Sequence, residues 1–305
     1  MIVQRQLLKF LAQAPNSCIP NKSWGTIGVR CLQTKENPTS SSLDRSTVKT
    51  FTLSDQTKSE VKHHASLANY WWDPLGPIKA LHALNKLRIP FICEGLKSQH
   101  KISSELINTT QMLKNQNILE IGCGGGILTE SLARIGSSVT ALDLSEDLIA
   151  LARHHLSLEQ NQELVDRIQY KIEPIEHHAS YRKNYYDAVV ISEVLEHVDE
   201  NDKIEFLRAS VETLKPGGSM FITTLNKTIS MWVVGVLIGE YILRAIPIGT
   251  HHYGKMISPE YVRHILNTLN CDTVLVKGSS YNFLRNYWSW TNTTSLFYAL
   301  HAVKK

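Results

Sequence analysis

Residues 117–130 read NILEIGCGGGILTE, and this stretch decides the fold. An apolar run of strand type ends in four closely spaced glycines, Gly122, Gly124, Gly125 and Gly126, and a helix-type sequence follows directly. Glycine permits the tight turn between a strand and a helix, and it lets the backbone approach a ligand closely. The dinucleotide fingerprint G-x-G-x-x-G would need glycine at position 127, where the chain has Ile127. The spacing therefore disfavours a nicotinamide-dependent oxidoreductase.

Strand-type and helix-type segments alternate on both sides of this turn. Strands are predicted at 117–122, 138–144, 168–173, 185–193 and 219–226, with helices at 127–136, 145–158 and 201–214. A helix at 258–269 has Ser258 as its N-cap and Pro259 in its first position. This order predicts an α/β fold with a Rossmann-like, doubly wound sheet, preceded by N-terminal helices at 51–70 and 81–96. Two last strands are expected at 271–278 and 296–304, the final one antiparallel at or near the sheet edge.

The N-terminal residues differ in composition from the rest of the chain. Residues 1–35 hold five basic residues and no acidic one, and removing these five from the 32 Lys and Arg leaves 27 against 28 Asp and Glu. The nearly neutral remainder gives no reason to expect a nucleic-acid partner. A basic, acid-free start with Leu7, Leu8, Phe10 and Leu11 is typical of a mitochondrial presequence, although a disordered tail has the same composition. We therefore predict a presequence and linker at 1–50 and one domain at 51–305.

The five cysteines, Cys18, Cys31, Cys93, Cys123 and Cys271, have no paired spacing. Neither a disulfide framework nor a zinc site is indicated, in keeping with a reducing compartment such as the mitochondrial matrix.

The most apolar stretch is MWVVGVLIGEYILRAIPIG at 231–249, inside an insertion at 227–257 after the fifth strand. A membrane-spanning helix needs about 20 predominantly apolar residues, and Glu240, Arg244 and Pro247 interrupt this stretch. Two interpretations stay open, a core helix and a segment that rests on the inner-membrane surface and admits an apolar substrate tail.

The glycine loop has the spacing E-x-G-x-G-x-G, which is associated with S-adenosylmethionine, and Asp143 at the end of the next strand is placed to accept hydrogen bonds from ribose hydroxyls. With LKPGG at 214–218, these elements resemble the class I S-adenosylmethionine-dependent methyltransferases, which implies a seven-stranded sheet. WWDP at 71–74, the LNKLR element ending at Arg88, ISEVLEHV at 191–198 and GEYILRAIPIGTHHYGK at 239–255 narrow the resemblance to the ubiquinone-biosynthesis O-methyltransferases over roughly 55–305.

That resemblance implies an enzyme that methylates hydroxyls of polyprenylated dihydroxybenzoate and demethylubiquinol on the matrix side of the inner membrane, in a complex with other proteins of the pathway. It also implies particular cofactor contacts, which are Arg88, Gly122, Gly124, Asp143 and Ser192. A guanidinium such as that of Arg88 is suited to pair with the methionine carboxylate of the cofactor.

Glu193, Glu196 and His197 follow the fourth strand, where an open α/β sheet presents its ligand crevice. Two carboxylates and an imidazole suit a hard cation such as Mg²⁺, which would bind both catechol oxygens, and the resemblance implies a metal here. The alternative is a metal-free site in which the glutamates cap a helix and His197 lines the pocket as general base. Glu193 is a further catalytic candidate, and His251 is a second histidine candidate from the GTH sequence.

Three other residues leave alternatives open. Trp71 and Trp72 are candidates to close over the cofactor or substrate, or to belong to the core. Asn226 either contacts substrate or caps the fifth strand. A catalytically silent, lipid-bound scaffold subunit is the alternative function, and the intact Gly122, Asp143 and Glu193 argue against it.

Overall fold

A computed structural model describes residues 70–228 and 256–305. Within them, a single sheet of eight strands has the order β3-β2-β1-β4-β5-β8-β6-β7. The first five strands are β1 (Asn117–Ile121), β2 (Ser138–Asp143), β3 (Ile168–Ile172), β4 (Tyr186–Ser192) and β5 (Leu214–Leu225). They pair in parallel, as the alternation of strands and helices predicts.

The three C-terminal strands are antiparallel to their neighbours. They are β6 (Cys271–Asn282), β7 (Tyr287–Thr291) and β8 (Phe297–Lys304). The antiparallel direction of the last strand is confirmed, because β8 pairs antiparallel with β5. Its expected place at or near the edge needs correction, since β8 lies between β5 and β6, and β7 forms the edge. The expected seven strands become eight because β6 extends beyond Gly278 and turns back into β7.

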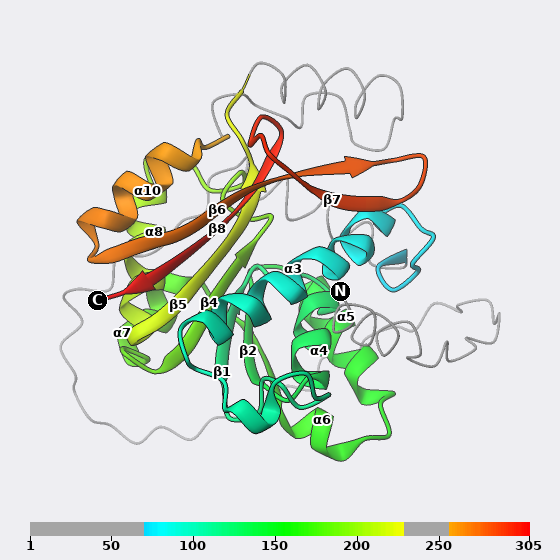
Figure 1. Cartoon of the computed structure of the whole chain (residues 1–305). Coiled ribbons are helices and arrows are strands. Elements are labelled where there is room, and N and C mark those ends of the chain that lie inside the picture. Colours follow the sequence, from blue (N-terminus) through cyan, green and yellow to red (C-terminus); the bar gives the residue numbers. More distant parts are fainter. Residues whose placement is uncertain (1–69, 229–255) are drawn as a thin grey trace, which may run out of the picture.

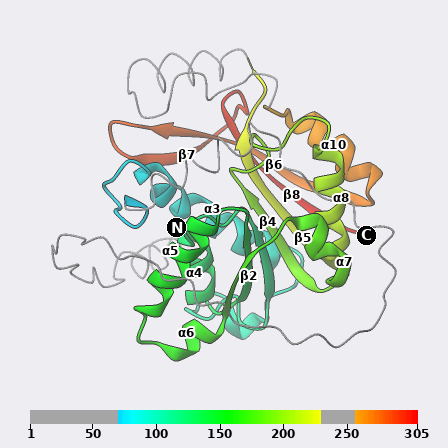
Figure 2. The same ribbon diagram turned by 180° about the vertical axis from the view of Figure 1, so that it is seen from behind.

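Helices cover both faces of the sheet (Figures 1 and 2). One face packs against α3 (Lys79–Ser98), α4 (Ile127–Arg134) and α5 (Glu146–Ser157), and the other against α7 (Ile175–Tyr181), α8 (Lys203–Thr213) and α10 (Pro259–Thr268). Neighbouring strand residues alternate between the two cores: Ile118 and Ala188 face the first core, whereas Leu119 and Val189 face the second. Both faces are therefore buried, as a doubly wound sheet requires.

The helix ends follow local signals that are visible in the sequence. Ser145 accepts a hydrogen bond from the backbone N–H of Leu148, and Ser258 accepts one from Tyr261, so both predicted N-caps are confirmed. Two short helices, α6 (Gln162–Asp166) and α7, and the 3-10 helix η2 (Ser104–Leu106) were not predicted, because each is too short to show a helical period.

Several predictions lie outside the described residues. They are the presequence and linker at 1–50, residues 51–69 of the helix expected at 51–70, the 231–249 segment of the 227–257 insertion, and His251. The domain boundaries therefore stay predictions. Among the described helices, none has the length and apolar character needed to cross a membrane.

Candidate active site

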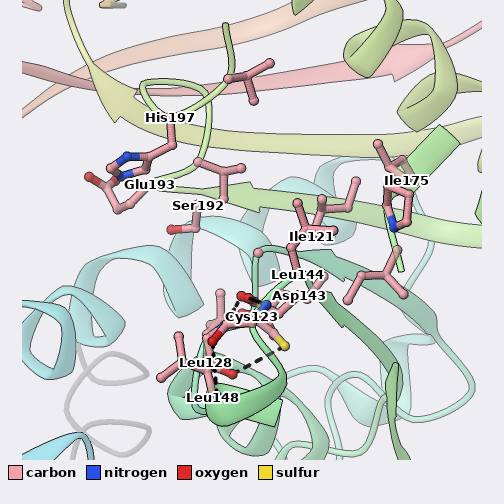
Figure 3. A pocket seen from close by; sticks show the side chains of 18 of the residues that line it. Ile121, Cys123, Leu128, Asp143, Leu144, Leu148, Ile175, Ser192, Glu193 and His197 are labelled. Atoms are coloured by element: carbon pink, nitrogen blue, oxygen red, sulfur yellow. Dashed lines mark hydrogen bonds between the residues drawn. The ribbon is translucent and has the colours of Figure 1, made fainter. Parts of the chain in front are cut away.

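A cavity of about 320 Å³ lies at the carboxyl ends of the central parallel strands. It is lined by residues from the ends of β1, β2 and β4, from α3, and from the segment that follows β3 (Figure 3). Seven of the predicted site residues line it together: Arg88, Gly122, Gly124, Asp143, Ser192, Glu193 and His197. The cavity therefore lies at the crevice where open α/β sheets bind their ligands.

The glycine loop between β1 and α4 has left-handed backbone at Gly122, Gly124 and Gly126, with φ of 73°, 54° and 89°. Residues with a Cβ rarely adopt this conformation. A Cβ at Gly122 would lie 2.4 Å from Val194, and one at Gly124 would lie 2.5 Å from the ring of Trp71. Side chains of the protein thus occupy the space where a Cβ would lie at Gly122 and Gly124. Glycine is therefore needed here for packing as well as for the close approach of a ligand that the sequence predicts.

Asp143 ends β2 and holds the glycine loop. Its carboxylate accepts hydrogen bonds from the backbone N–H of Gly124 at 2.7 Å and of Ser145 at 2.9 Å. Burial raises the pKa of Asp143, although these backbone hydrogen bonds oppose the increase. The side chain therefore connects the β1 loop to the start of α5 at the position where the sequence predicts a ribose contact.

Arg88 projects from α3 into the same cavity and is buried. Its Nη1 donates to the Ser192 hydroxyl at 2.8 Å, and its Nε donates to the Asn85 side-chain oxygen at 2.6 Å. Asn85 in turn donates to the carbonyl of Ile127 at 3.2 Å. The asparagine of the LNKLR element thus joins α3 to the start of α4 and orients the guanidinium, a role that sequence reasoning missed.

The charges of two carboxylates act on this guanidinium: that of Glu120, which is buried, and that of Glu193, which is partly exposed. Burial raises the pKa of Glu120 to about 7, although the hydroxyl of Thr129, which donates to it at 2.5 Å, and the charge of Arg88 act in the opposite direction. Burial also lowers the pKa of Arg88, which the two carboxylates oppose. The charge of Arg88 therefore favours the ionised form of both carboxyls, and burial opposes it.

Glu193 immediately follows β4, with left-handed backbone at φ 57°. A non-glycine residue in this region is strained, and such strain is concentrated at functional sites. Burial, and then the charge of Glu196, raise the pKa of Glu193 to about 7. Glu193 and His197 both lie at one end of the cavity (Figure 3), and the charge of His197 acts on the Glu193 carboxyl.

Glu196 points elsewhere. Its carboxylate accepts a hydrogen bond from the Thr224 hydroxyl at 2.6 Å, and the residue is not among those that line the cavity. Within residues 70–228 and 256–305, no group of three or more His, Cys, Asp and Glu side chains is arranged to hold a metal ion. As placed, Glu193, Glu196 and His197 therefore do not fit the predicted cation.

The remaining candidates divide as follows. Trp71 both lines the cavity and belongs to a small core cluster, so the two interpretations of this residue combine. Asn226 shows the strand-capping contacts, because its side chain donates to the Thr294 carbonyl at 2.7 Å and its backbone N–H to Leu296. Glu173 and Ile175 also line the cavity and were missed. They follow β3, so the rule that ligands bind beyond the strand ends was the signal that could have found them.

Comparisons with known proteins agree with this geometry. The methyltransferase domain family model matches residues 119–222. Among solved structures, magnesium protoporphyrin IX methyltransferase from Synechocystis PCC 6803 with bound SAH aligns over 82% of this chain and 95% of its own, at TM-score 0.55 and 15% identity. An N-methyltransferase from Bradyrhizobium japonicum in complex with S-adenosyl-L-homocysteine aligns over 82% of this chain and 99% of its own, at TM-score 0.53 and 16% identity. At these identities the likeness establishes the fold.

Curated relatives are much more similar. The mitochondrial ubiquinone biosynthesis O-methyltransferase of Rattus norvegicus is 42% identical over 245 residues, which are 80% of this chain and 69% of the rat protein. The human protein of the same name is 40% identical over 80% of this chain and 64% of its own length. The ubiquinone biosynthesis O-methyltransferase of Xanthomonas campestris is 36% identical over 83% of this chain and 97% of its own. The chain therefore belongs to the ubiquinone biosynthesis O-methyltransferase family, whose members are S-adenosylmethionine-dependent O-methyltransferases.

Proposed function

We propose that the protein transfers the methyl group of S-adenosylmethionine to a hydroxyl of polyprenylated dihydroxybenzoate and of demethylubiquinol. The observation that supports this most is the single cavity in which Arg88 and Asp143 lie together with Glu193 and His197. The names of the relatives, all ubiquinone biosynthesis O-methyltransferases, support the quinone-type substrate.

The residues present fit the cofactor. Arg88 is a buried guanidinium on the cavity wall, and a carboxylate such as that of methionine can pair with it bidentately. Asp143 offers carboxylate oxygens at the end of β2 for ribose hydroxyls, and Gly122 and Ser192 complete the predicted contacts. S-adenosylmethionine supplies a methyl group on a sulfonium, which is reactive enough that alignment is the main task of the protein.

In this proposal the acceptor hydroxyl lies next to Glu193 and His197, which line the same cavity as the cofactor residues. In this proposal His197 accepts the proton as general base, and Glu193 beside it stabilises the charged imidazole. Removing a general base typically lowers turnover by about 10²- to 10⁴-fold. His197→Asn should therefore lower kcat by roughly 100-fold or more, and Glu193→Gln should lower it by a smaller factor, with S-adenosylmethionine affinity within about threefold of wild type in both.

The deciding assay uses labelled S-adenosylmethionine with short-tailed dihydroxybenzoate and demethylubiquinol analogues. Product from both supports the proposal, and product from only one restricts the substrate to that one. Cofactor binding without transfer to either would contradict the proposal and favour the silent scaffold subunit.

The divalent cation at Glu193, Glu196 and His197 stays a prediction, and no step above depends on it. The repulsion by which Glu196 raises the pKa of Glu193 supports it, since a cation would relieve that repulsion, whereas the bond from Thr224 to Glu196 opposes it. Activity that survives exhaustive chelation would remove the metal from the proposal. If EDTA abolishes activity and Mg²⁺ restores it in the wild type but not in Glu196→Gln, the result would support a cation bound at Glu193, Glu196 and His197.

We also propose that the protein works on the matrix side of the mitochondrial inner membrane, together with other proteins of the pathway. The mitochondrial relatives and the apolar stretch at 231–249 support this location. Replacing residues of Met231–Ile238 with charged ones should lower liposome binding and leave S-adenosylmethionine binding unchanged. Unchanged liposome binding would favour the core-helix interpretation.

A further inference from the structure

The indole of Trp71 covers the outer side of the glycine loop. A Cβ added at Gly124 would lie 2.5 Å from its ring, and one added at Gly125 would lie 2.4 Å from it. Trp71 is buried against Ile127 at the start of α4 and Leu148 in α5, and it lines the cavity that holds Arg88 and Asp143. The ring therefore forms a wall of the cofactor cavity, although it belongs to the segment that precedes α3.

Residues 70–78, which carry Trp71, form turns ahead of α3 and no regular helix or strand beyond a single 3-10 residue at Tyr70. One contact holds this segment to the helix that follows it: His82 Nε2 in α3 donates to the carbonyl of Trp71 at 2.8 Å. The following residue provides a contact to the methyltransferase fold itself: the Trp72 indole stacks on the His155 imidazole of α5, with ring centroids 3.5 Å apart and planes 4° apart.

Among the described residues, the Trp72 indole is held by this stack and not by a hydrogen bond. Trp72 Nε1 is buried and has no hydrogen-bond partner within the part of the chain that the structure describes. Stacking and apolar packing therefore hold this indole in place.

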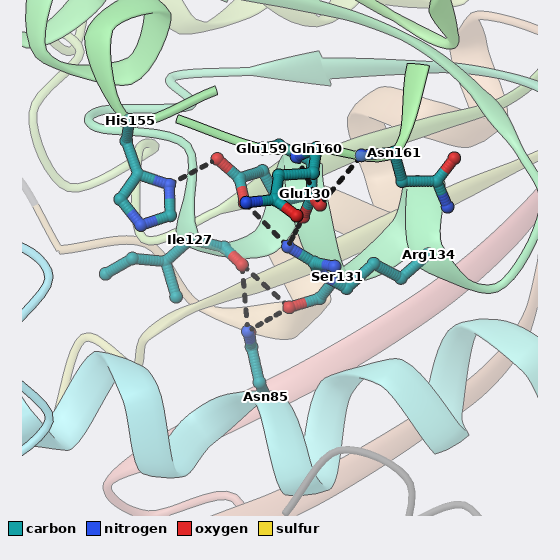
Figure 4. Close-up of polar contacts among 9 residues, drawn as sticks. All are labelled: Asn85, Ile127, Glu130, Ser131, Arg134, His155, Glu159, Gln160 and Asn161. Atoms are coloured by element: carbon teal, nitrogen blue, oxygen red, sulfur yellow. Dashed lines mark hydrogen bonds and ion pairs between the residues drawn. The ribbon is translucent and has the colours of Figure 1, made fainter. Parts of the chain in front are cut away.

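His155 is itself held at its other edge. Its Nδ1 lies 2.7 Å from a carboxylate oxygen of Glu130, which is almost fully buried in α4 (Figure 4). Arg134 lies 3.4 Å from the second oxygen of Glu130 and also binds Glu159 at 2.6 Å. The imidazole is thus fixed between the body of the fold and the Trp72 ring, and its side chain remains 31% exposed.

We infer that His155 and Trp72 are positioning residues, which hold Trp71 on the glycine loop and so keep the cofactor cavity closed on that side. Neither residue lines the cavity, so each acts through Trp71. The inference rests on S-adenosylmethionine being the cofactor, and it is independent of the identity of the methyl acceptor.

The consequence is kinetic as well as energetic. With Trp71 held in place, the ring covers the cavity on the side of Gly124 and Gly125, so a bound ligand should be released more slowly than with the 70–78 segment displaced. Loss of the stack should weaken this closed arrangement by the value of one aromatic pair, which corresponds to roughly five- to tenfold in an equilibrium constant. The effect should appear mainly in the dissociation rate, as is usual when contacts are removed from a preformed site.

The test uses the full chain and three variants at neighbouring positions of α5 and the 70–78 segment. His155→Ala removes both the stack and the contact with Glu130. His155→Phe restores an aromatic ring without that contact, and Trp72→Leu removes the ring on the opposite side. His154→Ala is the matched control, because His154 is exposed on the same helix turn.

S-adenosylmethionine affinity is measured by calorimetry, and the dissociation rate by stopped-flow displacement with S-adenosylhomocysteine. We expect His155→Ala and Trp72→Leu to raise both Kd and the dissociation rate by roughly five- to tenfold, with recovery to within about threefold in His155→Phe. The control should match the wild-type protein.

A purely structural role for His155 would change the unfolding midpoint in urea and leave the dissociation rate unaltered. Dissociation rates within about twofold of wild type in both His155→Ala and Trp72→Leu would overturn the inference. If His155→Ala does not fold, the folded His155→Phe and Trp72→Leu variants decide, since only the second should release the cofactor faster. A wild-type protein that binds no S-adenosylmethionine would contradict the proposed function instead, and the two failures are therefore distinguishable.

Discussion

At the scale of single residues, Arg88 is the group on which the cavity floor depends electrostatically. It is buried, and the charges of Glu120 and Glu193 both act on it. Burial disfavours the charged form of all three groups, and the pKa of each glutamate is raised to about 7. Without Arg88 both pKa values should rise further, so both carboxyls are expected to be protonated at neutral pH.

We therefore expect Arg88→Met to abolish measurable S-adenosylmethionine binding and to lower the free energy of unfolding by about 1–3 kcal/mol, because Asn85 and Ser192 lose a buried hydrogen-bond partner. Urea denaturation and calorimetry measure the two effects. Lys86→Met is the control, because Lys86 is exposed two residues earlier on α3 and should be neutral in both assays. An Arg88→Met protein as stable as the wild type would show that these hydrogen bonds contribute nothing to the fold, and retained S-adenosylmethionine binding would contradict the assignment of Arg88 to the cofactor.

Gly125 tests the contact between the glycine loop and Trp71. Its backbone is not left-handed, so Gly125→Ala has no φ strain and introduces only the 2.4 Å approach to the indole. Overpacking of this kind typically costs about 1–3 kcal/mol. In a protein that already carries Trp71→Ala, the same Gly125→Ala substitution should lower the free energy of unfolding much less, because the indole is gone. Additive effects in this double-mutant cycle would mean that the two residues are not in contact.

At the scale of elements, β8 has its position because it is buried on both faces. Tyr298, Leu300 and Ala302 face the core beneath α8 and α10, while Ala299 and His301 face the core beneath α3. His301 is almost fully buried, stacks on Phe221 of β5 with ring centroids 4.6 Å apart, and lies 3.1 Å from the Ser219 hydroxyl. Burial lowers the pKa of His301 to about 4.

The pH dependence of stability follows from this shift. The unfolded chain takes up a proton at His301 near its ordinary pKa, and the folded protein does so only near pH 4, so stability falls as the pH decreases from about 6.5 to 4. By pH 5 the contribution is about 2 kcal/mol. His301→Gln, which keeps a donor for Ser219, should therefore lose about 2 kcal/mol less than the wild type between pH 7 and pH 5 in urea denaturation. If the free energy of unfolding changes equally with pH in the wild type and in His301→Gln, His301 is not a buried neutral imidazole. His154→Gln, at an exposed histidine, is the control and should follow the wild type.

At the scale of the whole molecule, the cavity joins elements that belong to both cores. Its wall combines Arg88 of α3 and Ile127 of α4 on one face of the sheet with Ile175 of α7 and Phe206 of α8 on the other. A ligand that fills it contacts both layers at once. Binding should consequently stabilise the fold as one unit.

S-adenosylmethionine at 100 times its Kd should add about 2.7 kcal/mol to the free energy of unfolding, which raises Tm by roughly 5–10 °C. Calorimetry or differential scanning fluorimetry measures this shift, and NADH at the same concentration should produce none because Ile127 stands at the fingerprint glycine. A comparable shift with NADH would contradict the assignment of the cofactor.

The sequence by itself determined the parallel half of the fold. Strand and helix periods, the glycine turn and the N-caps at Ser145 and Ser258 are local signals, so five strands and the helices α3, α4, α5, α8 and α10 were readable from neighbouring residues. The same signals brought Gly122, Asp143 and Ser192 to one edge, because the carboxyl ends of parallel strands meet there.

Only the tertiary structure decided what depends on contacts between distant segments. The place of β8 inside the sheet follows from its burial between two helical layers, which its own sequence does not record. The contact of Trp71 with the glycine loop joins residues more than fifty positions apart, as does the Arg88–Ser192 bond, and Thr224 engages Glu196 from a neighbouring strand. Local periodicity carries no information about such pairs, because packing free energy arises when elements meet and not within any one of them.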